Sequence, residues 1–452
     1  MGTTEQLARF LAETKSSNVP NEALDAATTG LMDAVGTAIV ANTHEIGKII
    51  TQYTEEIGGT PTCRVIGTAI KTSAPNAALA NGTLGHADDY DDVGAFGHPA
   101  VTLMPTVLAI GEQMHKSGRE VLEAYALGFE VGARIGMNIG GDHYGRGWHS
   151  TSTIGTLASA AAASRLMGLD VAHTRTALGI AASLASGVQA NFGTMTKPLH
   201  PGNAARSGLL AANLASKGYT ANQDVIEAPL GYVAVFGDQQ VNLAAMTRQL
   251  GTAPYLIVNP GAGIKEWPCC YGNHGAIPLA TGLVAKYEIT PNHVESVEFI
   301  GAFARGFLNR PDAHTYFGGK FSLQFNIAAA IVDGGLTYET FTDEKVNDPA
   351  IQAMMKKVTL SEDPMRAGLP ARLLTAGERA QTMVIHLKDG REVRDSLDGI
   401  TNSLRGHQVD VKFEANAVQV LPRDQAKKAL GLLRNLKNIK DVSEVMDAVA
   451  FK

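Results

Sequence analysis

The feature that most restricts the fold of this chain is a series of segments rich in small residues, with apolar positions at helical spacing. In the clearest of them, the apolar residues recur every three or four positions from Leu24 to Ile39. Residues 154–166 are dense in Ala, Ser and Gly, and only 6% of the 452 residues are aromatic. Small side chains let helix backbones approach one another closely. The sequence therefore predicts a tightly packed helical region over about the first 260 residues.

The pattern changes after about Pro260. Residues 294–300 have the composition of a strand, and two strand-like runs flank Asp389-Gly390, a dipeptide favoured in hairpin turns. Helical spacing returns over residues 424–436 and 442–449. We therefore predict a mainly α fold in which an α+β segment lies between a helical region and a helical tail.

Charge and composition exclude several classes of protein. The formal net charge of −6 gives no basic footprint for nucleic acid. The sequence has no apolar run of signal-peptide or membrane-spanning length. Its three cysteines, Cys63 and the adjacent Cys269 and Cys270, form neither a disulfide framework nor a zinc-binding spacing. We expect a cytoplasmic protein with no nucleic-acid or membrane partner.

An acidic stretch, residues 82–99, is the most unusual segment of the chain. It contains the charged and aromatic residues His86, Asp88, Asp89, Tyr90, Asp91, Asp92 and His98. Four carboxylates so close together repel one another, yet small and apolar segments flank them, which is typical of the wall of a site. The alternative is a solvated, turn-rich loop, since clustered charges usually face water.

Three further polar segments interrupt apolar sequence, at residues 142–149, 191–202 and 265–274. Each is rich in Gly and Pro and is therefore predicted to be a loop, and loops on a rigid scaffold often carry sites. Taken singly, their histidines, Lys197 and Cys270 are ordinary structural or solvated residues. Together with the acidic stretch they offer carboxylates, imidazoles, a tyrosine and a lysine. That set suits proton transfer on a carboxylate substrate.

Two metal-dependent alternatives remain open at this point. Residues 88–92 fit the D-D-x-x-D pattern with which helical terpenoid synthases hold Mg²⁺ and a diphosphate, although no second acidic motif follows. His86, Asp89 and His98 are also a possible ligand set for a metal hydrolase. No Walker loop, G-x-S-x-G elbow or complete G-x-G-x-x-G fingerprint occurs, so nothing points to a nucleotide cofactor.

Five motifs, four from the acidic stretch and the polar segments and one further along the chain, resemble those of the MmgE/PrpD family. They are GHADDYDD with GHPA, GWHSTSTIG, NFGTMTKPLHPGNAARSG, KEWPCCYGNH and GKFSLQFNIA, in that order. The resemblance covers essentially the whole chain. It implies an all-helical domain of residues 1–264 with 405–452, and an α+β domain of residues 265–404. It also implies a homodimer that needs no metal or other cofactor.

The resemblance implies an active site as well, in which the distant segments converge into one pocket for a small di- or tricarboxylate. The expected catalytic residues are Asp89, His98, Tyr144, His149, Lys197 and His274, and the expected substrate-binding residues are His86, His200 and Arg206. In this hypothesis, Lys197 and His98 hold substrate carboxylates, and Asp89 fixes the tautomer of a histidine. His149, His274 and Tyr144 are the candidates for proton transfer.

Members of the family include 2-methylcitrate dehydratases, cis-aconitate decarboxylases and iminodisuccinate epimerases. Their shared chemistry is proton transfer at a carbon next to a carboxylate. We therefore expect a cofactor-independent lyase, with an epimerase as the alternative within this chemistry and a non-catalytic carboxylate-binding protein as the alternative outside it. Val93 stands where the decarboxylases carry a threonine, which weakens the case for cis-aconitate decarboxylation in particular.

Overall fold

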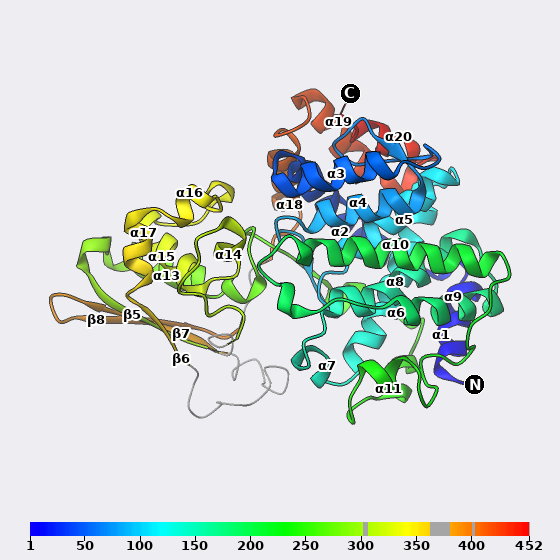
Figure 1. The fold of residues 1–452 in the computed structure, drawn as a ribbon, viewed down its shortest axis with the longest axis horizontal. Coiled ribbons are helices and arrows are strands. Elements are labelled where there is room, and N and C mark those ends of the chain that lie inside the picture. The colour runs from blue at the N-terminus through cyan, green and yellow to red at the C-terminus, as the bar shows by residue number, and fades with distance from the viewer. Residues whose placement is uncertain (302–305, 362–379, 400–402, 452) are drawn as a thin grey trace. The chain divides into compact units, whose positions relative to one another are not determined.

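The computed structural model describes residues 1–301, 306–361, 380–399 and 403–451, and these divide into two compact units (Figure 1). The helical unit comprises Met1–Ala190, Pro198–Ile264 and Leu404–Lys452. The α+β unit comprises Asn191–Lys197 and Lys265–Ser403. The predicted mainly α fold with a smaller α+β part is confirmed. The predicted domain boundaries after residues 264 and 404 stay a prediction.

The helical unit is built from helices in the first half of the chain and at its end, with two pairs of very short strands. Its helices are α1 (Thr3–Glu13), α2 (Asn21–Val40), α3 (Glu45–Ile57), α4 (Ala74–His86), α5 (Ala100–Gln113), α6 (Gly118–Asn138), α7 (Asp142–Gly145), α8 (Ser150–Met167), α9 (Val171–Leu184), α10 (Thr196–Ser216), α11 (Tyr232–Phe236), α12 (Leu243–Thr247), α18 (His407–Ala417), α19 (Arg423–Arg434) and α20 (Ser443–Ala448). Strand β1 (Cys63–Arg64) pairs with β2 (Lys71–Thr72), and β3 (Asp92–Val93) pairs with β4 (Gly263–Ile264), both antiparallel.

Close helix packing in this unit depends on the small residues that the sequence supplies. Helix α8, almost entirely buried, packs against α5 and α6. At the crossing of α4 and α10, a Cβ added to Gly82 would lie 2.7 Å from the Cα of Gly202, so only glycine fits there. This contact brings the C-terminal end of α4 and the first turns of α10 together. His86 and His200 lie on these two segments.

Three helices are not evident from local sequence patterns. Helix α10 begins at Thr196, within the segment 191–202 that was predicted to be a loop, and α5 begins at Ala100, so Pro201 and Pro105 lie inside helices. An interior proline removes a backbone hydrogen bond, so the local signal opposes a helix at both positions. Helix α18 was not predicted. Its buried side includes Val409, Phe413 and Ala417, which is too short an apolar series to stand out.

The α+β unit contains a four-stranded sheet covered on one face by helices (Figure 1). The strands β5 (Val294–Ile300), β6 (Val358–Ser361), β7 (Gln381–Leu387) and β8 (Glu392–Leu397) are arranged in the order β6-β5-β7-β8. Strand β6 is parallel to β5, and the other pairs are antiparallel. The helices are α13 (Ala276–Tyr287), α14 (Tyr316–Lys320), α15 (Leu323–Asp333), α16 (Asp343–Val346) and α17 (Pro349–Met355).

The core of the α+β unit lies between the sheet and these helices. Helices α13 and α15 contact the sheet and each other, and α17 packs on α15. The predicted hairpin is present, and Gly390 in its turn has a φ of 89°, a backbone conformation that glycine adopts without strain. Phe192 belongs to this core although it lies about 70 residues before the rest of the unit in the chain.

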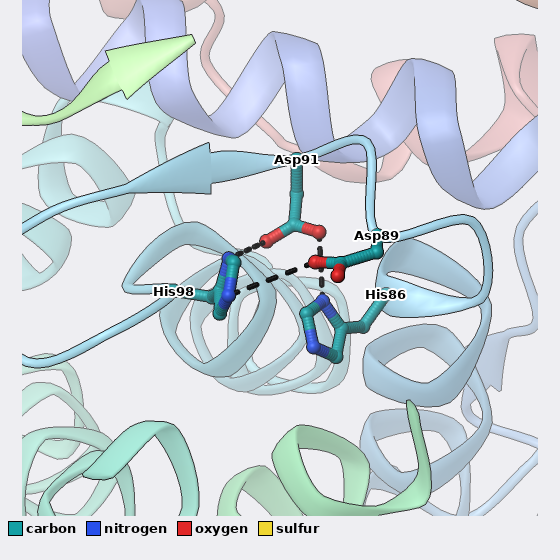
Figure 2. A group of neighbouring side chains, drawn as sticks. All are labelled: His86, Asp89, Asp91 and His98. Atoms are coloured by element: carbon teal, nitrogen blue, oxygen red, sulfur yellow. Dashed lines mark hydrogen bonds and ion pairs between the residues drawn. The ribbon is translucent and has the colours of Figure 1, made fainter. Parts of the chain in front are cut away.

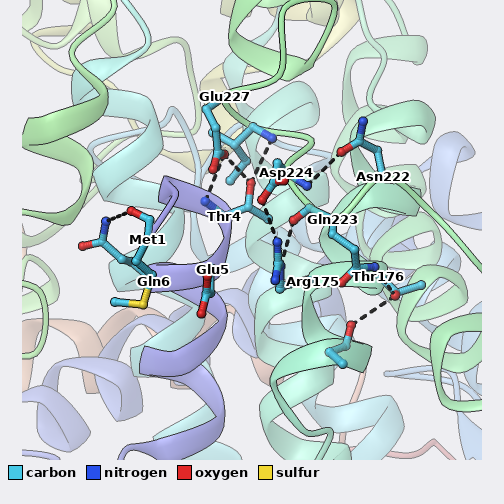
Figure 3. Close-up of polar contacts among 12 residues, drawn as sticks. Met1, Thr4, Glu5, Gln6, Arg175, Thr176, Asn222, Gln223, Asp224 and Glu227 are labelled. Atoms are coloured by element: carbon cyan, nitrogen blue, oxygen red, sulfur yellow. Dashed lines mark hydrogen bonds and ion pairs between the residues drawn. The ribbon is translucent and has the colours of Figure 1, made fainter.

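Helix α1 is fastened to a later loop of the helical unit (Figure 3). The backbone N–H of Thr4 donates to the Glu227 carboxylate at 3.0 Å, and the Thr4 hydroxyl accepts from the N–H of Ile226 at 3.1 Å. Arg175 on α9 binds the same loop through the Asp224 carboxylate at 2.6 Å. None of the helices in the described part of the chain is long and apolar enough to cross a membrane.

Candidate active site

The residues expected in the active site are distributed over both units. His86, Asp89, His98, Tyr144, His149, His200 and Arg206 belong to the helical unit, whereas Lys197 and His274 belong to the α+β unit. Their assembly into one pocket stays a prediction.

The acidic stretch is buried, so its interpretation as a solvated loop is wrong. His86 ends α4, and the chain then turns through Asp89, whose φ of 51° lies in the left-handed region that aspartate tolerates. Asp92 enters β3, and its carboxylate accepts from the N–H of Ala100 at the start of α5. Asp88, Asp89, Asp91 and Asp92 are each 3% exposed or less. Buried carboxylates need partners, and the nearby histidines supply them.

Asp91 bridges two histidines at the centre of this stretch (Figure 2). One carboxylate oxygen accepts from Nδ1 of His86 at 2.7 Å, and the other lies 3.0 Å from Nδ1 of His98. Burial alone would raise the pKa of the Asp91 carboxyl, but the charges and hydrogen bonds of His86 and His98 hold it well below its usual value. Asp91 is therefore an ionised carboxylate between two imidazoles.

This contact pattern also sets the tautomer of His98. Its Nδ1 lies 2.6 Å from the backbone carbonyl of Asp92 as well as close to Asp91, so Nδ1 carries a proton. The basic nitrogen of the neutral ring is then Nε2, which lies 3.7 Å from the Asp89 carboxylate. Sequence reasoning expected Asp89 to fix a histidine tautomer. In the structure the Asp92 carbonyl accepts the hydrogen bond from Nδ1, the Asp91 carboxylate lies 3.0 Å from the same nitrogen, and Asp89 faces Nε2.

The same four residues form the group best suited to a metal ion among the residues that the structure describes. One ligand atom from each of His86, Asp89, Asp91 and His98 lies within 4.8 Å of the others, and all four side chains are buried. However, both Asp91 oxygens already face protonated Nδ1 atoms. An ion would have to break these contacts, so the arrangement fits a hydrogen-bonded network better than a metal centre.

A second histidine pair lies beside this network. His149 precedes α8 as its N-cap, and His200 lies on α10. Their Nδ1 atoms are 2.9 Å apart, and the residues are 2% and 8% exposed. The His149 ring centroid lies 6.2 Å from that of His86 and 6.4 Å from that of His98. Five predicted site residues of the helical unit are thus brought together, and Asp91 joins them.

The remaining two predicted residues of this unit are placed differently. Tyr144 lies on the short helix α7, where sequence reasoning expected a loop, and it is 43% exposed. Arg206 follows His200 by six residues on α10, a rotation of about 240° that directs it to another face of the helix. Both residues thus differ in exposure or helix face from the buried histidines, and their place in the active site stays a prediction.

The α+β unit supplies a buried lysine beside aromatic rings. Lys197 is 3% exposed, and its ammonium lies 5.1 Å from the ring centroid of Phe321 and 5.5 Å from that of Phe192. Ring faces stabilise a cation by their quadrupole without cancelling its charge. Lys197 lies in the first turn of α10 rather than in the loop that the sequence predicts.

His274 is fully buried in the same unit, between aromatic side chains. Its ring centroid is 5.2 Å from that of Trp267 and 5.4 Å from that of Tyr271. Burial raises the pKa of Tyr271, and the charge of Lys265 partly opposes this. Lys265 is itself completely buried. Sequence reasoning did not select Lys265 as a site residue, although its position in the polar segment 265–274 was a signal.

Fold and site together define a class of protein: a two-unit chain in which a helical unit buries paired histidines and aspartates, and an α+β unit buries lysines beside aromatic rings. Comparison with known proteins identifies the family. Residues 5–244 match the model of the MmgE/PrpD N-terminal domain, and residues 267–438 match that of the MmgE/PrpD C-terminal domain. The chain belongs to the MmgE/PrpD family, as the sequence motifs indicated.

Several characterised relatives are similar to the chain over nearly its whole length. The human cis-aconitate decarboxylase is 28% identical, over 97% of this chain and 93% of that protein. The mouse cis-aconitate decarboxylase is 27% identical, over 97% and 92%. The cis-aconitate decarboxylase of Aspergillus terreus is 26% identical, over 99% and 95%.

Proposed function

We propose that this protein is a lyase that acts on a small di- or tricarboxylate by proton transfer at a carbon next to a carboxylate. The observation that carries the proposal is the buried network in which Asp91 fixes His86 and His98 beside the His149–His200 pair. Imidazoles with defined tautomers are suited to general acid–base catalysis near neutral pH. The names of the relatives support the lyase class.

The second element of the proposal is substrate binding by Lys197. A carbon acid next to a carboxylate is weakly acidic, so charge that develops in the transition state must be stabilised by fixed positive groups. Lys197 offers a buried ammonium over ring faces. In this proposal Lys197 binds a substrate carboxylate, and His149 transfers the proton, with His274 as a further candidate.

Two lyase reactions fit these proposed roles. Loss of CO₂ from an unsaturated tricarboxylate leaves a carbanion that an acid must protonate, whereas loss of water needs a base at carbon and an acid at the departing hydroxyl. The relatives are named as decarboxylases, and so cis-aconitate is the first substrate to test. Val93, in β3 directly after the acidic cluster, stands where the decarboxylases carry a threonine, and this difference favours a substrate other than cis-aconitate.

A substrate panel tests the proposal. Purified protein is incubated with cis-aconitate, 2-methylcitrate, citrate and iminodisuccinate, and the products and their stereochemistry are followed by NMR. We expect loss of CO₂ or water from at least one of the tricarboxylates. Inversion of iminodisuccinate alone would replace the lyase by an epimerase. Tight binding of a panel member without turnover of any would make the protein a carboxylate-binding protein.

A further inference from the structure

We propose that His149 and His200 form a proton relay, in which His200 stores the proton that His149 exchanges with the substrate carbon. This inference rests on the proposed function, because it assigns His149 a carbon acid as its reaction partner. It changes the role of His200, which the sequence suggested as a substrate-binding residue. In the relay, His200 is a positioning residue that acts through His149.

The short distance between the two Nδ1 atoms indicates that the rings share a proton. Two Nδ1 atoms 2.9 Å apart are within hydrogen-bond distance, and nitrogen atoms make such a contact only when one donates a proton to the other. The pair therefore holds one proton between its Nδ1 atoms. Two fully protonated rings would present two N–H groups to each other and repel, so the pair carries at most one positive charge.

The shared proton couples the two ring nitrogens of His149. When His149 is the donor, its Nδ1 is protonated and its Nε2 has a lone pair, so His149 is a base. When His200 is the donor, His149 accepts at Nδ1 and carries its proton on Nε2, so His149 is an acid. When Nε2 of His149 takes up the substrate proton as the Nδ1 proton crosses the 2.9 Å contact to His200, His149 changes from base to acid without becoming charged.

The proton count balances over a reaction. As the C–H bond of the substrate breaks, its proton bonds to Nε2 of His149, and the Nδ1 proton of His149 passes to Nδ1 of His200. His149 stays neutral, His200 becomes an imidazolium, and the electron pair of the C–H bond stays on the carbanion. In the return step, Nε2 of His149 gives its proton to the departing hydroxyl or to carbon, and His200 returns its Nδ1 proton. Both rings are then neutral again.

The surroundings hold the pair in place. The backbone of His149 is held on both sides. Its backbone N–H donates to the Gly187 carbonyl at 3.1 Å, and its backbone carbonyl accepts from the backbone N–H groups of Ser152 and Thr153 in α8. His200 is fixed by α10, whose backbone touches α4 at Gly82. Titratable groups that lie near His149 in the helical unit include His86 on α4 and His98 before α5, and the Asp91 carboxylate contacts both of these rings.

Two variants separate the relay from a merely structural contact. In His200→Asn, the side-chain amide can still hydrogen-bond Nδ1 of His149 but cannot take up a proton. We expect kcat to fall about 100-fold, the low end of general acid–base contributions, with KM within a factor of about three. We also expect the pH profile of kcat to lose one ionisation. His143→Asn is the matched control, since His143 is equally buried in this unit and contacts Thr153 and the Phe236 carbonyl instead.

The deciding experiment is ¹⁵N NMR of histidine-labelled protein without substrate. We expect one strongly hydrogen-bonded Nδ1 proton that is absent from His200→Asn and retained in His143→Asn. Spectra in which both Nδ1 atoms lack a proton at neutral pH would overturn the relay. So would a His200→Asn variant with wild-type kcat and pH profile. Lack of turnover of any carboxylate would instead overturn the proposed function, and the spectra would still decide whether the pair shares a proton.

Discussion

Lys412 and Lys197 are buried lysines of the helical and the α+β unit, and their contacts can be compared. In the helical unit, the ammonium of Lys412 on α18 lies 2.8 Å from the Asp33 carboxylate and 3.8 Å from the ring centroid of Tyr90, and it donates to the backbone carbonyl of Tyr90 in the acidic stretch. In the α+β unit, Lys197 lies over the ring faces of Phe192 and Phe321.

The ion pair of Lys412 indicates a structural role for this lysine. A carboxylate at 2.8 Å offsets the charge of Lys412, and its contacts join α18 to α2 and to the turn that carries Asp89 and Asp91. Ring faces stabilise both ammonium groups. We therefore expect Lys412 to contribute mainly to stability, and under the proposed function we expect Lys197 to contribute to substrate binding and turnover.

The largest effect that this comparison predicts is on stability. Lys412→Met leaves the buried Asp33 carboxylate without its ammonium partner, so the free energy of unfolding should fall by about 3–5 kcal/mol. Urea denaturation followed by circular dichroism measures this change. Lys437→Met is the matched control, because Lys437 lies 3.4 Å from Asp25 at the surface, and such pairs contribute up to about 1 kcal/mol. If Lys412→Met is no less stable than this control, the Lys412 contact is not a structural ion pair.

The next effect concerns Lys197. Lys197→Ala should lower kcat/KM about 100- to 1,000-fold, as removal of one group that stabilises an oxyanion does, while the helical circular dichroism stays unchanged. The matched control is Lys345→Ala, since Lys345 lies in the same unit but forms a partly exposed pair with Asp333. Unchanged turnover in Lys197→Ala would remove Lys197 from the site. The two lysines would then no longer differ in role.

Much of the fold follows from local sequence patterns. The long helices were predictable because their apolar positions recur over many turns, as in α2, and the hairpin because its turn dipeptide is specific. The starts of α5 and α10 could not be predicted, because each helix contains a proline, which disfavours a helix locally. Tertiary packing stabilises these helices in spite of their prolines. The α18–α2 contact joins residues far apart in sequence, and no local pattern encodes it.

The candidate site was likewise predictable from sequence only where the signal is local. The sequence located the acidic stretch and the histidines, because clustered charge within apolar sequence is conspicuous. It could not tell Asp91 from its three acidic neighbours, since the difference depends on which carboxylate the turn at Asp89 directs between His86 and His98. The contact between His149 and His200 likewise depends on the packing of α10, whose first turns were expected to be a loop.

A smaller, pH-dependent effect is expected at Asp91. Its pKa is lower in the folded protein than in the unfolded chain, so its contribution to stability is present above the unfolded value of about 3.9 and is lost as the pH falls towards the folded value. Asp91→Asn should therefore cost about 1.5–3 kcal/mol at pH 7, typical of hydrogen bonds to a charged group. The difference in the free energy of unfolding between variant and wild type should become smaller below about pH 4. Urea denaturation at pH 7 and at pH 3.5 measures this difference at each pH. A gap independent of pH contradicts an ionised Asp91 with a lowered pKa.

The smallest expected effect is that of metal removal. Because both oxygens of Asp91 face histidine Nδ1 atoms, we expect exhaustive dialysis against a chelator to leave turnover unchanged. Loss of activity on chelation, with recovery on adding back Zn²⁺ or Mn²⁺, would show that His86, Asp89, Asp91 and His98 hold an ion.

Solvent deuterium exchange tests the central claim most directly. The protein is incubated in D₂O with each carboxylate of the panel, and deuterium at the carbon next to the carboxylate is followed by NMR in substrate and product. We predict that wild-type protein introduces deuterium at that carbon and that His149→Gln does not. A carboxylate that the wild-type protein decarboxylates without deuterium entering the product at any carbon would contradict proton transfer by this site.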